Sequence, residues 1–384
     1  MDRSRLRRHD LDALRVLAVL LLVPFHSARV FDVFDPFYVK SPTTSGGLSW
    51  AVVAFLNPWH MPLLFVLAGA ATWLALGHRD ARAYLGERTR RLLVPLLFGL
   101  LVVVPPQGFL AVRFRGGRES VAGFLGDYWT VEGDLSGYTG SWTPAHLWFI
   151  GFLFIFSLVA LPLLVRWRGR RLHARWLLVA MPLVLLAANK LPAPNDGPQS
   201  PWYSLALFVA GFLLVADQCA EGAVHRHWRP LLVAAAATMA TVLGVWHSGA
   251  ADHWPDGSPL DVGFSLVEQA NTWLWVLALL GTARALLSRP VRGLGYASEA
   301  SFPCYVLHQT VIVGVAYLVV GWDLPVWERF AAVCLGGFAL TLVLYEGLVR
   351  RTNPTRFLFG MKPLRPATVR PPVADAQPVP TSRS

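Results

Sequence analysis

The stretch HDLDALRVLAVLLLVPFHSARVF, residues 9–31, decides the fold. Its apolar run is long enough to cross a bilayer as a helix, yet it contains Arg15 and His26, which are both costly to expose to lipid. The two residues are eleven positions apart, so on a helix they share one face and are separated by roughly 16 Å along the axis. This spacing predicts a polar face that looks into a helical bundle. Two plainer interpretations remain open: Arg15 snorkels to the headgroups, and His26 bonds a neighbouring helix.

The composition is that of an integral membrane protein. Of the 384 residues, 54% are hydrophobic and only 15% are charged, a balance outside the range of soluble domains. The net charge of +11 is scattered between apolar runs, which argues against nucleic-acid binding and is typical of membrane topology. The three cysteines, Cys219, Cys304 and Cys334, have no close spacing, so neither a metal site nor a disulfide framework is expected.

Apolar runs of about twenty residues predict an all-α bundle of about ten transmembrane helices. The basic start followed by a long apolar run is interpreted as a retained membrane segment rather than a cleaved signal peptide. The expected spans are residues 11–31, 50–76, 92–112, 145–165, 174–191, 202–216, 230–247, 264–286, 302–320 and 327–349.

The distribution of basic residues predicts the orientation. With the N-terminus in the cytoplasm, 26 of the 34 Lys and Arg residues fall in cytoplasmic segments and seven fall outside, as the positive-inside rule requires. Both termini are therefore expected in the cytoplasm, and the protein is expected to be a multi-pass protein of the cytoplasmic membrane. Residues 350–384 are rich in Pro, Thr, Ser and Arg, which predicts a disordered cytoplasmic tail after a membrane domain of residues 1–349.

The longest outer loop, residues 113–144, is rich in glycine and aromatic residues. Loops of this length in compact proteins tend to be functional, so we expect either a lid over an outward-facing cavity or a variable surface loop.

Four further polar or aromatic residues stand inside or beside the spans. His60 enters the second span from outside and is expected at the depth of His26, in a span that Asn57 and Pro58 make irregular. His146 and Trp148 open the fourth span, and His308 is expected in the inner half of the ninth. A neutral histidine is suited to take a proton from a hydroxyl, although any one of them could equally be a satisfied structural group.

Arg88 and Arg91 stand in the segment GERTRRLLVP, expected as a cytoplasmic loop before the third span. Guanidinium groups at that surface can hold phosphates through paired hydrogen bonds; ordinary positive-inside anchoring is the alternative. The motifs of serine hydrolases, metalloproteases and nucleotide triphosphatases are absent from the sequence.

Taken in order, LDALR with Arg15 and His26, HMPLLFVLAG, Arg88-x-x-Arg91, HLWFIGFLF and YVLH resemble the acyltransferase 3 family of membrane O-acyltransferases. The sequence is most similar to the branch that contains the glucan-succinylating membrane proteins, over residues 9 to about 349.

The resemblance implies transfer of an acetyl or succinyl group from cytoplasmic acyl-CoA to a hydroxyl of a carbohydrate, glycolipid or small molecule, often in the cell envelope. In that family the histidine that matches His26 is the base, and the arginine that matches Arg15 is the second catalytic residue. The arginines that match Arg88 and Arg91 bind the donor. His60, Trp148 and His308 join Arg88 and Arg91 as expected substrate-binding residues. Acyl-CoA would be a co-substrate, with no bound cofactor or metal expected, and direct transfer is expected rather than an acyl-enzyme.

The alternative from another class is a transporter or flippase for a glycolipid or small molecule, in which the same polar face lines a transport path. The sequence shows no internal repeat of the kind that many secondary transporters carry, which favours the enzyme.

Overall fold

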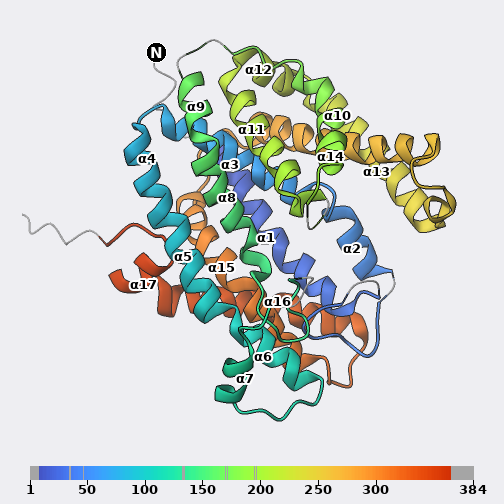
Figure 1. Ribbon diagram of the computed structural model, residues 1–384, viewed down its shortest axis with the longest axis vertical. Coiled ribbons are helices and arrows are strands. Elements are labelled where there is room, and N and C mark those ends of the chain that lie inside the picture. The colour runs from blue at the N-terminus through green and yellow to red at the C-terminus, as the bar shows by residue number, and fades with distance from the viewer. Residues whose placement is uncertain are drawn as a thin grey trace, which may run out of the picture.

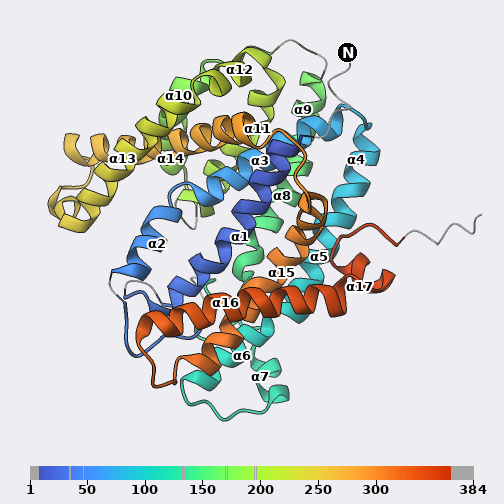
Figure 2. The same cartoon turned by 180° about the vertical axis from the view of Figure 1, so that it is seen from behind.

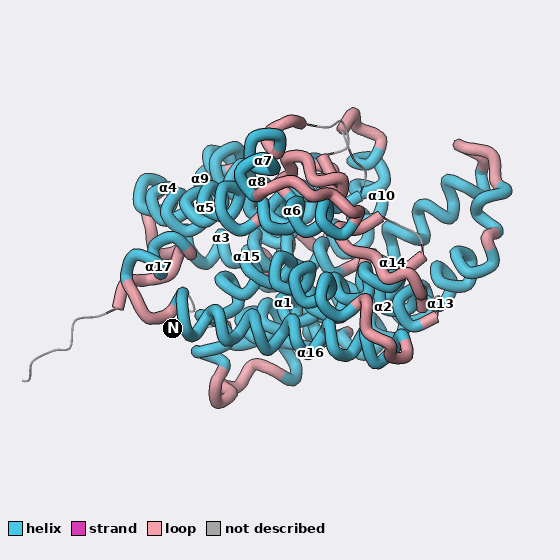
Figure 3. Tube along the Cα trace, turned by 90° about the horizontal axis from the view of Figure 1, so that it is seen from below, coloured by secondary structure: helices cyan, strands magenta, loops and turns pink. Residues whose placement is uncertain are grey.

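The computed structural model describes residues 8–33, 36–45, 47–131, 135–168, 170, 172–193, 195 and 197–364. All regular structure in these residues is helical, as Figure 3 shows, which confirms the predicted all-α class. The α-helices are α1 (His9–Phe31), α2 (Leu48–Leu56), α3 (His60–Leu76), α4 (Ala81–Arg88), α5 (Val94–Phe98), α6 (Pro105–Phe114), α7 (Val121–Asp127), α8 (Trp148–Val159), α9 (Leu161–Trp167), α10 (Leu177–Asn189), α11 (Pro201–Ala216), α12 (Gln218–Arg226), α13 (Trp228–Ser248), α14 (Pro259–Leu286), α15 (Leu294–Val319), α16 (Val326–Leu344) and α17 (Asn353–Leu358).

Helix α1 is the central element of the bundle. It crosses the middle of the molecule in Figures 1 and 2, and it packs against α2, α3, α14, α15 and α16. The hairpin of α13 and α14 projects sideways from this bundle, whereas α6 and α7 lie at one end and α12 at the other. Helix α1 is therefore surrounded by other helices, although the Arg15 side chain on its polar face stays partly exposed.

Six helices of the described chain are long and apolar enough to cross a membrane, or eight if two bent pairs each count as one span. The prediction of a multi-spanning protein is confirmed to this extent, whereas the count of ten is not reached. The two remaining predicted spans correspond to α10, which at 13 residues is short for a bilayer core, and to the more polar α14.

The second span is interrupted at residues 57–59, between α2 and α3, as Asn57 and Pro58 predict. Helix α3 then lies directly against α11. A Cβ placed on Gly69 would lie 1.8 Å from the carbonyl oxygen of Phe208, and one on Gly211 would lie 2.0 Å from that of Val66. The two backbones are thus in direct contact, which only glycine permits.

The segment predicted as a cytoplasmic loop around Arg88 and Arg91 is instead helical. Residues 81–114 form one span of 34 residues, in which α4, α5 and α6 are joined by the π-helices η2 (Thr89–Leu93) and η3 (Gly99–Val103). Pro95 lacks an N–H and its ring crowds the preceding turn, so an ordinary α-helix is unfavourable here. The π-turn η2 accommodates this proline. The loop prediction was wrong because the helix begins at Ala81, before the apolar run, and so includes the charged residues.

Helices α11 and α12 meet at an angle of 92° at Asp217. The Asp217 carboxylate caps α12 by accepting hydrogen bonds from the N–H groups of Cys219 and Ala220, and it also accepts one from Ala174. Burial alone would raise the pKa of Asp217, but these backbone donors outweigh it and hold that pKa below its ordinary value. One ionised side chain thus fixes the bend and ties it to the segment before α10.

The beginning of the predicted disordered tail is structured. After the π-helix η7 (Tyr345–Val349), Thr352 caps α17, and Arg356 and Met361 are buried. Residues 365–384, the rest of that prediction, lie outside the described residues.

We expect Gly69→Ala to destabilise the protein, because the added methyl group would push α3 away from a backbone rather than from a flexible side chain. The expected loss is about 1–3 kcal/mol or more, measured as a lower thermal unfolding midpoint in detergent. Gly244→Ala is the control: it lies on α13 with open space around its Cβ position and should be neutral or slightly stabilising. Equal midpoints for the two variants would contradict the contact.

Candidate active site

Three histidines from separate parts of the chain meet beside α1. The ring of His308 on α15 lies 5.1 Å from that of His26 on α1 and 5.0 Å from that of His146, which precedes α8. Tyr305, one turn before His308, has its ring 5.8 Å from His146. We call His26, His146, Tyr305 and His308 the histidine cluster. His308 lies just past the middle of α15 (Leu294–Val319), not in its first half, where the inner half of the span was expected.

Hydrogen bonds fix the protonation pattern of two of these rings. His146 Nε2 lies 2.9 Å from the carbonyl oxygen of Val306, and His308 Nδ1 lies 2.6 Å from that of Tyr305. Because a carbonyl oxygen can only accept, each of these nitrogens must carry the proton, and the other nitrogen of each neutral ring is left as a base. These basic nitrogens, His146 Nδ1 and His308 Nε2, are buried without a hydrogen-bond partner among the described residues, and so is His26 Nδ1.

Tyr305 holds His146 from the other side, since its hydroxyl donates a hydrogen bond to the backbone carbonyl of His146. The segment before His146 is also fastened. Ala145 has a left-handed φ of +44°, which costs a non-glycine residue about 1–2 kcal/mol. The Thr143 hydroxyl accepts the Ala145 N–H at 2.8 Å and donates to the Leu135 carbonyl at 2.6 Å. The loop is thus held in an unfavourable conformation that aims His146 at the cluster.

Aromatic side chains from two interhelical segments cover one side of the cluster. Phe37 stacks on His26 with ring centroids 6.2 Å apart, and Tyr38 and Tyr138 meet edge to face at 5.0 Å. Tyr38 donates to the carbonyl of Ser136, and burial raises its pKa well above the ordinary value, so it stays a neutral donor. We call Phe37, Tyr38 and Tyr138 the aromatic cover. Tyr138, in the loop expected to be either a lid or a variable surface loop, therefore contacts the ring that covers His26. Residues 132–134 of that loop lie outside the described residues.

His60 and Trp148 lie near the cluster but outside it. His60 Nε2 donates a hydrogen bond to the carbonyl of Ala18 at 2.6 Å. Because Ala18 precedes His26 by eight residues on α1, His60 and His26 are only approximately at the same depth. Phe25 contacts the rings of both histidines. Trp148 packs among aromatic rings of the core, namely Phe65, Phe149 and Phe152.

Arginines gather at the other end of α1. Arg15 pairs with Asp12 at 2.7 Å, and Arg15, Arg88 and Arg90 each lie close enough to Arg91 for their charges to repel. We call Arg15, Arg88, Arg90 and Arg91 the arginine cluster. The structure brings together Arg15, Arg88 and Arg91, and it separates Arg15 from His26 by about half the length of α1, as the eleven-residue spacing predicts.

The four arginines differ in how firmly they are held. Arg88 donates to the Thr72 hydroxyl at 3.1 Å and lies over the ring of Tyr84. Arg91 pairs with Glu87 at 3.1 Å and keeps 46% of its side chain exposed. A cluster of mutually repelling cations, partly exposed at a helix end, is suited to bind phosphate.

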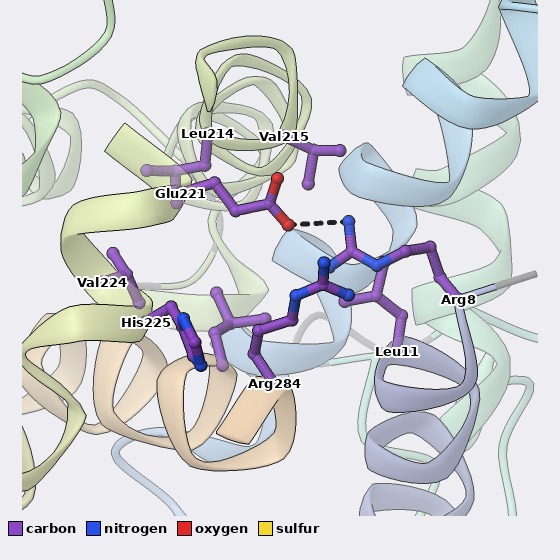
Figure 4. Close-up of a pocket in the computed structure, with 9 residues that line it drawn as sticks. Arg8, Leu11, Leu214, Val215, Glu221, Val224, His225 and Arg284 are labelled. Atoms are coloured by element: carbon purple, nitrogen blue, oxygen red, sulfur yellow. Dashed lines mark ion pairs between the residues drawn. The ribbon is translucent and has the colours of Figure 1, made fainter. Parts of the chain in front are cut away.

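A separate small cavity of about 30 Å³ lies between the start of α1, α12 and α14. Figure 4 shows the Glu221 carboxylate paired with Arg8, with Arg284 beside them. Burial alone would lower the pKa of Arg8, but hydrogen bonds and charges from Asp10 and Glu221 raise it above its ordinary value. The cations that line this cavity therefore face carboxylates, Arg8 facing Glu221 and Arg284 facing Asp10.

The histidine cluster does not form a metal site. In the described ranges, no group of three His, Cys, Asp or Glu side chains is placed to hold a metal ion.

A family profile described as "Acyltransferase domain" matches residues 8–346. The chain belongs to the acyltransferase 3 family. Together with its apolar helices, this membership identifies a multi-pass membrane acyltransferase.

The individual relatives share only low sequence identity with this chain. The chain is 24% identical over 183 residues to glucans biosynthesis protein C of Salmonella paratyphi B, covering 47% of this chain and 45% of that protein. It is 23% identical over 167 residues to the protein of that name in Salmonella heidelberg, covering 43% of this chain and 41% of that protein. The alignments thus span less than half the length of either relative. No solved structure matches the chain significantly.

Sequence reasoning named His146 without giving it a specific role, and it did not single out Tyr305. Both stand inside motifs that carry the family resemblance, HLWFIGFLF and YVLH. The contact of His146 with Tyr305 and His308 depends on how the start of α8 packs against α15, which helical periodicity does not encode.

We expect Tyr305→Phe to lower the thermal unfolding midpoint, because it leaves the buried carbonyl of His146 without its donor. Such a loss costs about 1–3 kcal/mol. Tyr317→Phe serves as the control, because Tyr317 lies on the same helix with its side chain 36% exposed. If both variants unfold at the wild-type temperature, the hydroxyl does not hold His146.

Proposed function

We propose that the protein transfers an acetyl or succinyl group from cytoplasmic acyl-CoA to a hydroxyl of a carbohydrate, glycolipid or small molecule in the cell envelope. The observation that carries the proposal is the histidine cluster on the central helix of a chain that belongs to an acyltransferase family. The name of the relatives, glucans biosynthesis protein C, favours a carbohydrate acceptor.

In the proposed reaction His26 is the general base. Its ring takes the proton of the acceptor hydroxyl as the hydroxyl oxygen attacks the thioester carbonyl. The carbon–sulfur bond then breaks, the acyl group stays on the acceptor oxygen, and the CoA sulfur takes the proton from the imidazolium. His146 and His308 each have one basic nitrogen that is buried without a hydrogen-bond partner among the described residues, and they are suited to accept a hydrogen bond from the acceptor or to share the proton. No acyl-enzyme is required.

The donor would bind at the arginine cluster. Arg88 and Arg91 would hold the phosphates of CoA, and Arg15 would help to orient them. Since Arg15 and His26 are separated by roughly 16 Å along α1, the extended pantetheine arm of CoA would carry the thioester from one cluster to the other.

This direction of transfer requires a particular topology. We propose ten spans in the cytoplasmic membrane with both termini in the cytoplasm, so that the arginine cluster faces the cytoplasm and the aromatic cover faces outward. The charge distribution of the loops supports this orientation.

The topology predicts that reporter fusions after residues 140 and 255 behave as extracytoplasmic, because each position follows an odd number of crossings. Alkaline phosphatase and green fluorescent protein fusions in intact cells would measure this. A cytoplasmic signal from either position would overturn the proposed topology.

His26→Gln should abolish acyl transfer, because glutamine keeps the size and hydrogen bonding of the side chain but cannot accept the proton. The expected loss in kcat is on the order of a hundredfold to ten-thousandfold, measured with labelled acetyl-CoA or succinyl-CoA and glucan oligosaccharides. His253→Gln, at an exposed histidine of the outer hairpin, is the matched control and should retain full activity.

Near-normal activity of His26→Gln would make His26 a structural residue, and His60 would be the next base to test. If the wild-type protein instead consumes no acyl-CoA and moves a glycolipid across vesicles, the transporter interpretation replaces this one.

A further inference from the structure

The segment after η7 folds back onto the arginine cluster. We call Asn353–Leu364 the C-terminal clamp. It begins with α17, and its Phe359 packs edge to face on Phe98 of α5 with ring centroids 5.4 Å apart. In Figures 1 and 2, α17 lies beside α5, at the end of α16.

The clamp is held together by a buried arginine. Arg356, with only 5% of its surface exposed, donates from Nε to the carbonyl of Lys362 at 2.6 Å and pairs with Glu299 of α15. The Met361 N–H donates back to the carbonyl of Arg356 at 2.7 Å. These bonds close the turn through Gly360 and attach it to the bundle, so the segment has a defined shape.

The turn makes its closest approach at Arg91. Gly360 has a left-handed φ of +66°, and a Cβ there would lie 2.8 Å from the Arg91 carbonyl oxygen and 3.0 Å from Pro95 Cγ. Its own carbonyl accepts a hydrogen bond from Arg91 Nε at 3.4 Å. Because Pro95 has no N–H, Arg91 cannot form the usual i+4 bond of an α-helix, and the clamp lies against the backbone at that position.

We propose that the C-terminal clamp positions Arg91 for the acyl donor, with Gly360 as the positioning residue. The guanidinium is held at Nε by Gly360 and at Nη1 by Glu87, and its side chain remains 46% exposed. Its open side is thereby presented to a phosphate in a fixed orientation, which lowers the entropy lost on binding. The inference rests on the proposed role of Arg91 in donor binding.

The test compares four variants by steady-state kinetics with varied acyl-CoA. Gly360→Ala should raise the KM for acyl-CoA roughly tenfold, the effect of weakening a charged hydrogen bond, and should leave kcat within about twofold. Gly347→Ala, in the neighbouring η7 with open space around its Cβ position, should change neither value. Arg91→Ala should raise the KM at least as much as Gly360→Ala, and the double variant should show no further increase because both changes act through one guanidinium.

A merely structural clamp would give a different pattern. If Gly360→Ala lowers kcat or the thermal midpoint and leaves the KM for acyl-CoA unchanged, the positioning role is overturned. If Arg91→Ala itself leaves the KM unchanged, the donor role fails, and the two failures are thereby distinguished. If Gly360→Ala does not fold, Arg356→Lys takes its place. Lysine keeps the charge but cannot reproduce the forked hydrogen bonds of Arg356, so the same rise in the KM for acyl-CoA is expected. An unchanged KM in this variant overturns the proposal.

Discussion

The structure depends on the rule that a polar group inside an apolar bundle must find a partner within the protein. His60 and His146 meet this rule by donating to backbone carbonyls of neighbouring helices, α1 and α15. These bonds join helices that are far apart in sequence. They also decide which nitrogen of each ring remains basic, so one set of contacts determines both the packing of the bundle and the chemistry that its centre can perform.

Helix α1 separates two groups of polar side chains, one of charged arginines and one of neutral histidines. At its beginning, partly exposed arginines repel one another and attract anions; further along, neutral imidazoles are shielded by aromatic rings. A single rigid helix keeps these environments at a constant distance. A substrate that is anionic at one end and reactive at the other, such as an acyl-CoA, matches this arrangement.

The sequence predicted the all-helical class, the irregular second span and the shared face of Arg15 and His26, because these follow from hydropathy and helical periodicity. It did not predict the contacts of His308 with His26 and His146, which depend on packing between distant helices. Arg88 and Arg91 were expected in a loop because they precede the apolar run that begins at residue 92, whereas the helix begins earlier, at Ala81, and includes this charged stretch. The ordered clamp was not predicted because it is held by the buried Arg356, whereas an arginine in a polar stretch usually indicates an exposed, unstructured tail.

The aromatic cover has a consequence for the fate of the donor. Water at cellular concentration is a competing nucleophile for any activated thioester, and a histidine that can deprotonate a sugar hydroxyl can also deprotonate water. Phe37 is only 3% exposed and Tyr38 only 1%, so in this conformation bulk water has little access to the His26 ring from that side. In the proposed reaction, a loaded donor could therefore wait for its acceptor without being hydrolysed.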